Sequence, residues 1–430
     1  MTDVIATNQT ILVVGGGISG MSAALEAAEC GKDVILLEKN PSLGGRVSKL
    51  YKYFPKMCYP TCGMEINLRR IKANKKVRII TMAEVTEVTG DTGNYNVNIK
   101  TAPRYVNNNC TACGACSDAT ETEFANEHNY GLNKRKGAYL PFFMAYPQRY
   151  VIDPALIGTD DANKVKDACK YDAVDLDMQE ENLTFNVGAI IWATGWQPYD
   201  ANKIQPYAYD RNPNVITSVE FERMMDPMGP TGGKILRPSD NKEAKDIAFI
   251  QCAGSRDINH LKHCSRICCT ATLKQTTYVR EHHGDDGKST IYYIDIRAID
   301  RFEDLYTKVK ADSTVSFIKS KVANITNDKE TNNPILNGVD TEGYNRYSNP
   351  HELVVLAVGM QPSVDFAKLG INVSVNEHGF IENDAGNGSM FAAGCASDAL
   401  DVNRAVQSAT ASALRAIQVV NQVSTTEGGA

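Results

Sequence analysis

The chain has 430 residues, of which 43% are hydrophobic and 22% charged, so it is long enough for two or three domains of an ordinary water-soluble protein. A net charge of −6, without a dense run of Lys or Arg, argues against nucleic-acid binding and against adsorption to an anionic membrane. No apolar run approaches the roughly 18 residues of a membrane span, and the first ten residues hold an acid and no basic cluster, which argues against a secretory signal. We therefore expect a cytoplasmic protein that reaches a membrane only through a partner.

The first forty-five residues predict a dinucleotide-binding unit. The apolar run ILVV reads as a buried strand, GGGISG follows it, and a helical stretch leads to a second apolar strand that ends at Glu38. Gly15, Gly17 and Gly20 have the G-x-G-x-x-G spacing, which allows a tight turn, a close approach of the backbone to a pyrophosphate, and close helix–strand packing. The helix N-terminus would stabilise the phosphate charge, and Glu38 would accept hydrogen bonds from the ribose.

Three further motifs favour FAD as the nucleotide. The stretch EKNPSLGGR resembles the segment after the acidic residue in two-dinucleotide-domain flavoproteins, GAIIWATGWQP resembles their Ala-Thr-Gly strand, and GSMFAAGCASD resembles their late FAD motif. The resemblance implies that the late acid, Asp398, helps to hold the ribityl and pyrophosphate portion. The predicted FAD-binding residues are Gly15, Gly17, Ile18, Ser19, Gly20, Glu38, Lys39, Gly44, Gly45, Arg46, Ala193, Thr194, Gly195, Gly394 and Asp398.

Twelve cysteines are unusually many for a chain in which we expect no export signal. Disulfides are rare in the cytoplasm, so clustered cysteines indicate metal or redox chemistry. Cys58 and Cys62 form a C-x3-C pair, whereas flavin-proximal thiol pairs commonly have C-x2-C or C-x4-C spacing. These two are either such a pair, additional ligands or packing residues, and we assign no catalytic residue.

Residues 103–178 predict a ferredoxin-like domain inserted into the FAD unit. The stretch NNNCTACGACSDAT places Cys110, Cys113 and Cys116 at the C-x2-C-x2-C spacing that wraps a 4Fe–4S cluster in bacterial ferredoxins. The usual fourth cysteine is missing, and in two-cluster ferredoxins it would serve the other cluster. Cys169, in DACKYDAVDLD, is the surviving trailing cysteine of a second motif. We therefore predict a single 4Fe–4S cluster in the insert, bound by these four cysteines.

The region 241–357 predicts a second dinucleotide-type domain that has lost its nucleotide site. The strand DIAFIQ is followed by CAGSRD instead of a glycine motif, whereas STIYYIDIRAI, STVSFIKSKVANI and HELVVLAVGM keep the pattern of the remaining strands. The missing motif argues against direct use of NAD(P)H.

Four more cysteines gather in that region. Cys252 follows the strand, and Cys264, Cys268 and Cys269 lie in LKHCSRICCTATLKQTTYVREHH, whose residues favour a helix throughout. On that helix Cys264 and Cys268 would share a face and Cys269 would not, so we expect a helix start distorted around a ligand. A 4Fe–4S cluster is favoured over zinc, because the paired C-x2-C knuckles of a structural zinc site are absent from this stretch. Buried or disulfide-forming thiols are the alternative.

The combination CAGSRD…HCSRICC resembles the cluster signature of HdrA, the flavin subunit of heterodisulfide reductase, in a family that also has a ferredoxin domain inserted into its FAD domain. The similarity extends from residue 10 to about residue 420. It implies an α/β fold of the two-dinucleotide-domain, disulfide-reductase-like class, FAD, and a 4Fe–4S cluster on Cys252, Cys264, Cys268 and Cys269. The expected domains are an FAD domain in three segments, 1–102, 179–240 and 358–430, the insert at 103–178, and the degenerate domain at 241–357.

The short form of the chain resembles one branch of this family. Typical HdrA has an N-terminal cluster-bearing extension and a C-terminal ferredoxin domain, which we do not find here, and the reduced form resembles the QmoA-type flavoproteins of the quinone-interacting membrane-bound oxidoreductase (Qmo) complex of sulfate reducers. That resemblance implies an electron-transfer subunit peripherally attached to the inner membrane through a second HdrA-like flavoprotein and a haem- and iron–sulfur-bearing membrane subunit, working between menaquinone and adenylylsulfate (APS) reductase. The alternatives are a truncated heterodisulfide-reductase flavin subunit serving thiol–disulfide electron transfer and, less favoured, an NAD(P)H-dependent disulfide reductase.

Overall fold

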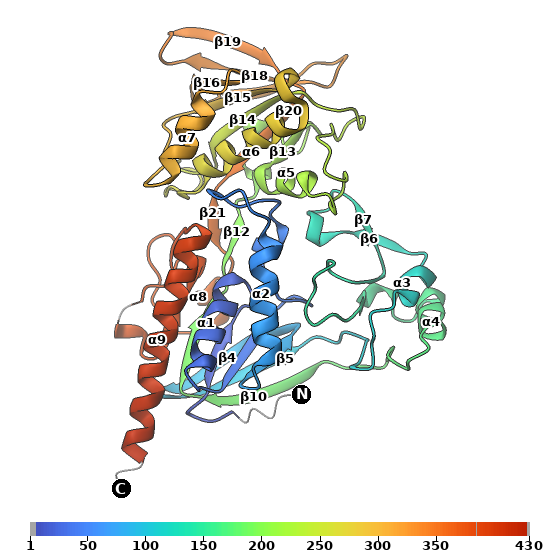
Figure 1. Cartoon of the computed structure of the whole chain (residues 1–430), viewed down its shortest axis with the longest axis vertical. Helices are drawn as coiled ribbons and strands as arrows, with labels where there is room; N and C mark the ends of the chain where they lie inside the picture. Colours follow the sequence, from blue (N-terminus) through green and yellow to red (C-terminus); the bar gives the residue numbers. More distant parts are fainter. Residues whose placement is uncertain (1–5, 384, 428–430) are drawn as a thin grey trace. The chain divides into compact units, whose positions relative to one another are not determined.

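The computed structural model describes residues 6–383 and 385–427, and the chain divides into two compact units (Figure 1). The first unit contains the chain up to Ser48, the segment Thr61–Trp196, and the chain from Pro362 on, while the second contains Lys49–Pro60 and Gln197–Gln361. The chain passes between the units through the short strands β12 (Trp196–Pro198) and β21 (Met360–Pro362). Residues 1–5, on which part of the signal-sequence prediction rests, lie outside the described residues.

The first unit is built on a five-stranded parallel sheet in the order β22-β11-β1-β2-β3. The central strand β1 is apolar and almost fully buried, as expected of a strand covered on both faces. Helices α1 and α9 lie side by side (Figure 1), and their alanines share one hydrophobic core, which lets the two backbones approach closely. The bounds are β1 Ile11–Val14, α1 Ile18–Glu29, β2 Val34–Glu38, α2 Pro60–Ala73, β3 Val77–Thr81, β11 Ala189–Trp192, α8 Phe366–Leu369, β22 Met390–Ala392 and α9 Val402–Glu427.

An antiparallel sheet in the order β10-β5-β4 completes the FAD-type part of this unit. Buried and exposed residues alternate along β5 (Asn94–Thr101), which indicates a sheet with one face in the core. Strand β4 covers Ala83–Asp91 and β10 covers Glu181–Val187. Thr101, at the end of β5, pairs with Glu181, at the start of β10, so the insert between them leaves and returns at neighbouring positions of one sheet.

The insert has its own small hydrophobic core. Buried Val106, Leu156, Val165 and Val174 form it together with Cys116, and Cys110 and Cys169 are partly buried against it. Its elements are α3 (Ala115–Ala119), β6 (Glu123–Ala125), β7 (Lys134–Lys136), β8 (Ala138–Tyr139), β9 (Val151–Ile152) and α4 (Asp160–Asp167). Three of the four predicted cluster cysteines therefore lie in or against the core of the insert.

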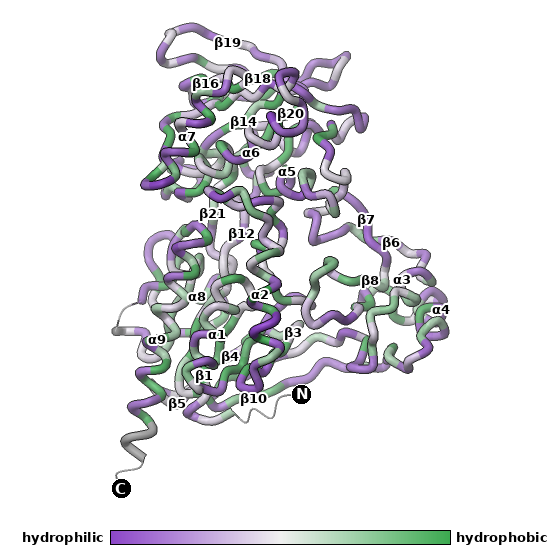
Figure 2. Tube along the Cα trace, in the orientation of Figure 1, coloured by the Kyte–Doolittle hydropathy of each residue, from purple (hydrophilic) through white to green (hydrophobic). Residues whose placement is uncertain are grey.

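The second unit repeats the plan of the first. A parallel sheet in the order β13-β20-β14-β15-β16 is accompanied by an antiparallel sheet β17-β18-β19. Figure 2 shows the predominantly polar residues of β19 in purple, in contrast to the apolar strand β20. The bounds are β13 Val215–Thr217, α5 Ser218–Met225, β14 Asp246–Ala253, α6 Cys268–His283, β15 Lys288–Tyr293, α7 Phe302–Lys310, β16 Val315–Lys319, β17 Asn324–Asn327, β18 Pro334–Asp340, β19 Asn345–Pro350 and β20 Leu353–Val358. Because β13 pairs with β20, this unit extends further toward the N-terminus than the degenerate domain expected at 241–357.

Candidate functional site

The glycine loop between β1 and α1 requires its glycines for steric reasons. Gly15 has a φ of +114°, and a Cβ added there would lie 2.3 Å from the carbonyl oxygen of Ala193. A Cβ on Gly20 would lie 1.7 Å from the carbonyl oxygen of Gly15. Helix α1 begins after Gly17 without a capping side chain, so no side-chain cap uses its first backbone amides. Such a helix start is suited to bind a pyrophosphate.

Two other predicted motifs lie against this loop. The amide of Gly44 donates to the carbonyl of Gly16 at 2.9 Å, and a Cβ on Gly45 would lie 2.8 Å from the Cα of Gly17. The late motif meets the start of α1, because a Cβ on Gly394 would lie 2.0 Å from the Oγ of Ser19. The structure thus brings together residues that are far apart in the sequence into one backbone-lined surface.

Glu38 ends β2 beside the glycine loop and is 5% exposed. Its Oε2 accepts a hydrogen bond from the Gly16 amide at 2.7 Å, and its Oε1 accepts from the amide and the side chain of Asn40 at 2.8 and 2.7 Å. Burial raises the pKa of the Glu38 carboxyl, and the hydrogen bonds from Asn40 and Gly16 oppose that rise. An acid at this strand end has the place of the ribose-binding residue of a dinucleotide fold.

The remaining predicted flavin residues differ in their surroundings. The Lys39 side chain is 72% exposed and pairs with Glu84, so it points away from the loop's buried carboxylate. Arg46 donates from Nε to the carbonyl of Trp196 at 2.5 Å and from Nη1 to the Tyr130 hydroxyl at 3.0 Å. The Trp196 ring also lies under the Arg46 guanidinium, 4.9 Å from its centroid.

The other members of that predicted set have mostly backbone roles. Ala193 is buried, the carbonyl of Thr194 accepts from the Ser363 hydroxyl at 2.5 Å, and Gly195 has a φ of +73°. Ile18 is the first residue of α1, and the Oδ1 of Asp398 accepts from the Ala399 amide at 2.7 Å. The fold therefore leaves the flavin prediction resting mainly on backbone surfaces and on Glu38.

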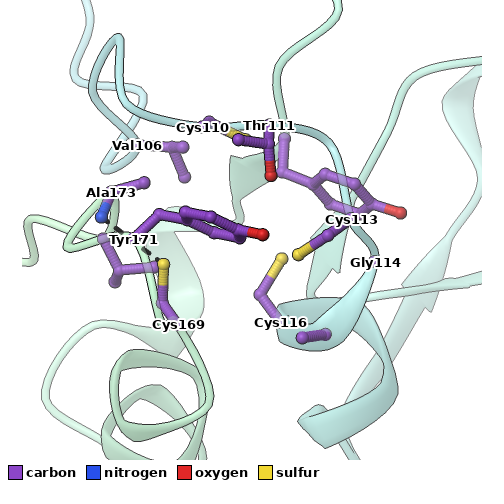
Figure 3. Close-up of a pocket in the computed structure, with 12 residues that line it drawn as sticks. Val106, Cys110, Thr111, Cys113, Gly114, Cys116, Cys169, Tyr171 and Ala173 are labelled. Carbon is purple, nitrogen blue, oxygen red and sulfur yellow. Dashed lines mark hydrogen bonds between the residues drawn. The ribbon is translucent and has the colours of Figure 1, made fainter.

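Cys110, Cys113, Cys116 and Cys169 line one pocket of the insert, with a volume of about 330 Å³ that includes space open to solvent (Figure 3). Figure 3 shows the sulfurs of Cys113, Cys116 and Cys169 directed toward this common space, with the ring of Tyr171 across it. The backbone also donates to sulfur, because the amide of Ala112 lies 3.4 Å from the Sγ of Cys110 and the amide of Ala173 lies 3.4 Å from the Sγ of Cys169. Amide donors to cysteine sulfur around a shared space suit an iron–sulfur cluster.

Four cysteines of the second unit gather at the C-terminal edge of its parallel sheet. Cys252 has a φ of +55° at an irregularity of β14, and Cys268 and Cys269 are the first two residues of α6. The Cys268 thiol lies 3.7 Å from the carbonyl of Val358, at the end of β20. Ligands of open α/β sheets bind at this edge, so the cysteines occupy the place where a dinucleotide fold binds its nucleotide.

The helix expected around these cysteines is shorter than predicted, which corrects the placement of Cys264. Helix α6 begins at Cys268, and the preceding residues form bends and turns. Arg266 has a φ of +62°, and its amide donates to the Sγ of Cys264 at 3.4 Å, so the chain turns about the sulfur instead of continuing the helix. Cys264 and Cys268 are therefore not on one helix face, although the prediction of a distorted start is confirmed.

Mutual electrostatic effects show that both sets of thiols are close together. Burial raises the pKa of Cys116 to about 12, and the charges of Cys110, Cys113 and Cys169 add to that rise. Burial likewise raises the pKa of Cys269 to about 11, with contributions from Cys252 and Cys264. Binding to a metal cluster would favour the thiolate forms that burial disfavours.

All twelve cysteines are free thiols. Cys58 is half-buried with its carbonyl accepting from the Tyr53 amide at 3.0 Å, while Cys62 is exposed in the first turn of α2. Across residues 6–383 and 385–427, no group of three or more His, Cys, Asp or Glu side chains is arranged to hold a single metal ion. Among the same residues, no helix combines the length and the apolar character that crossing a membrane requires.

The structure also identifies charged neighbours of the cysteines that the motifs do not reveal. Arg256 contacts the Cys252 thiol and pairs with Asp295, whose carbonyl lies 3.7 Å from the Cys269 Sγ. In the insert, the charge of Cys110 acts on Arg104 and Arg149. Arg256 could have been suspected from its place four residues after Cys252, but no local pattern marks the two arginines of the insert.

Comparisons with known proteins agree with this arrangement. The FAD-dependent oxidoreductase family matches residues 10–61. Among solved structures, thioredoxin reductase from T. acidophilum has a TM-score of 0.52 at 14% identity, covering 95% of this chain and 98% of its own. Thioredoxin reductase from Lactococcus lactis has a TM-score of 0.53 at 13% identity, covering 96% and 99%. The chain therefore has the two-domain α/β fold of the flavin-containing disulfide reductases.

Curated relatives show a closer similarity in sequence. An HdrA iron–sulfur protein of the CoB–CoM heterodisulfide reductase of Methanopyrus kandleri is 38% identical over 418 residues, which covers 94% of this chain and 63% of the relative. The HdrA of the H2:CoB–CoM heterodisulfide,ferredoxin reductase of Methanothermobacter marburgensis is 33% identical over 425 residues, covering 96% and 64%. The chain thus spans less than two thirds of the length of these relatives. Over the length that it shares with them, the chain is an oxidoreductase that belongs to the HdrA-like family.

Proposed function

We propose that the chain is an HdrA-type electron-transfer flavoprotein that carries FAD and two 4Fe–4S clusters and serves thiol–disulfide electron transfer through partner subunits. The observation that carries the proposal is the gathering of eight cysteines into two sets, one around the pocket of the insert and one at the sheet edge of the second unit. The similarity to HdrA supports this function better than the quinone-linked function that the resemblance to Qmo proteins implies.

The donor sets fit iron–sulfur clusters on chemical grounds. Each set offers four cysteine thiols, and backbone amides already donate to Cys110, Cys169 and Cys264. The second set also lies at the N-terminus of the sixteen-residue helix α6, where the helix dipole stabilises negative charge. Cys110, Cys113, Cys116 and Cys169 would hold one cluster, and Cys252, Cys264, Cys268 and Cys269 the other.

FAD, when bound, can exchange two electrons or one at a time, which links hydride-type and single-electron chemistry. The residues of this chain would bind and orient it. The amides at the start of α1 would bind the pyrophosphate, Glu38 would accept hydrogen bonds from the ribose, and Gly44 and Gly45 would allow the nucleotide to approach the backbone. The absence of a glycine motif after β14 supports an electron route that does not use NAD(P)H at that edge.

Cofactor analysis of the anaerobically purified chain tests this function. We expect about eight irons per FAD and two distinguishable signals in electron paramagnetic resonance (EPR) spectra of the reduced protein. Cys169→Ser should abolish one signal and Cys264→Ser the other, with flavin content unchanged. About four irons per FAD, or the loss of the same signal in both variants, would contradict the assignment of two separate clusters.

A Qmo-type role is the second candidate, favoured by the single set of four cysteines in the insert. In that role the partners would be a second HdrA-like flavoprotein, APS reductase, and a haem- and iron–sulfur-bearing membrane subunit, with menaquinone as the other end of the electron route. The genes encoded beside this chain distinguish the two candidates. Neighbouring APS reductase genes would favour the Qmo-type role, and heterodisulfide reductase B and C genes without them would favour the HdrA-type role.

A further inference from the structure

Arg104 is a buried cation at the junction between the insert and the FAD-type part of the first unit. It is 5% exposed, and its Nη1 donates to the carbonyl of Arg149 at 3.1 Å. Its Nη2 donates to the Thr81 hydroxyl at 2.8 Å and to the carbonyl of Pro41, in the loop that follows Glu38. All three acceptors are neutral.

No acidic side chain pairs with Arg104 among the residues that the structure describes. Arg135, a comparably buried arginine of the same insert, differs in this respect because its guanidinium pairs with Glu127 at 2.7 Å and with Asp153 at 2.9 Å. Burying a charge without an opposite charge is costly, so a cation of this kind requires a compensating group.

The anionic group that acts on Arg104 is a cysteine of the insert. Burial and the neighbouring charge of Arg149 lower the pKa of Arg104 to about 9, which still leaves the guanidinium charged at pH 7. Tyr139 and Cys110 oppose that fall, but burial raises the pKa of the Tyr139 hydroxyl, which is therefore neutral at pH 7. The Cys110 sulfur is thus the negative group that compensates Arg104.

We propose that Arg104 is a positioning residue that raises the reduction potential of the insert cluster, because it places an uncompensated positive charge beside the ligand Cys110. Reduction adds one electron, and therefore one negative charge, to the cluster, and a nearby cation in a poorly solvated site favours that form. The inference rests on the proposed function, since it requires a cluster on Cys110.

The test is an EPR-monitored redox titration of the full chain, purified with its cofactors. The insert signal is identified by its loss in Cys169→Ser. Arg104→Gln should shift the reduction equilibrium of that signal about tenfold toward the oxidised form, which is a fall of about 59 mV for a one-electron couple. Arg104→Lys, which keeps the charge, should recover most of the shift.

Arg135→Gln is the matched control, because it removes a buried arginine whose charge two carboxylates already compensate. It should leave the potential of the insert cluster near the wild-type value. Arg149→Gln removes the second cation on which Cys110 acts and should lower the potential by a smaller amount, so it decides the question if Arg104→Gln fails to accumulate.

An unchanged potential in Arg104→Gln, or equal shifts in the Gln and Lys variants, would overturn the inference. If only Arg149→Gln can be measured, an unchanged potential in that variant would overturn it as well. A wild-type protein without any EPR signal that Cys169→Ser removes would instead contradict the proposed function itself.

Discussion

A buried ion pair in the second unit gives a sharp test of how this fold is held together. The Lys274 side chain is 2% exposed, and its Nζ lies 2.7 Å from Glu222 and donates to the carbonyl of Lys52 at 2.6 Å. Glu222 also accepts from the amide of Tyr51 at 3.1 Å. The pair therefore fixes the segment 49–60, which the chain contributes from far upstream, to helix α6.

Lys274→Met should be strongly destabilising, because it leaves the buried Glu222 without its cation. Removing one member of a buried pair costs about 3–5 kcal/mol, which lowers the melting temperature of a unit of this size by roughly 6–20 °C. The double variant Glu222→Gln/Lys274→Met removes both charges and should recover a large part of this loss, since Gln275 and Tyr51 can still donate to the amide oxygen.

Thermal unfolding and amide hydrogen exchange measure the two parts of this prediction. We expect faster exchange in peptides covering residues 49–60 in Lys274→Met than in the wild type. Lys164→Met serves as the control, because it breaks a solvent-exposed pair with Glu121 on the insert and should change little. The reasoning is refuted if Lys274→Met is no more destabilising than Lys164→Met, or if the double variant is as unstable as the single one.

Three further predictions concern the flavin and cluster sites. Gly20→Ala forces a methyl group onto the carbonyl of Gly15 and should cost about 3 kcal/mol and abolish flavin binding, whereas Gly63→Ala, inside α2 with open space around it, should stabilise the protein by about 0.5–1 kcal/mol; calorimetry and flavin absorbance report both. In flavin-free protein, the raised pKa of Glu38 contributes stability that is complete below pH 4.5 and is lost as the pH rises through the folded-state pKa, so denaturant titrations of Glu38→Gln should lack this dependence. Cys116→Ala should lower iron content by about four per chain, and an unchanged iron content would contradict the insert site.

The parts of the fold that were predictable are those whose signal is local. The strand β1, the glycine turn and α1 follow from an apolar run, a glycine spacing and a helical pattern that agree with one another. The helix expected from residue 261 begins instead at Cys268, because propensity does not report that the Arg266 amide turns back to the Cys264 sulfur. Arg104 could not have been identified at all, since its partners Pro41, Thr81 and Arg149 are separated from it in sequence and no motif includes them.

The attachment of the insert has a consequence for how such a protein can evolve. Because β5 and β10 are paired where the insert leaves and returns, its two ends are held a strand's width apart by the sheet itself. Residues within the insert can then change, and cysteines of a second cluster can be lost, without altering the register of the strands that support the flavin-binding loops. The number of redox centres is in this way separated from the stability of the nucleotide-binding fold, and selection can adjust one while the other is preserved.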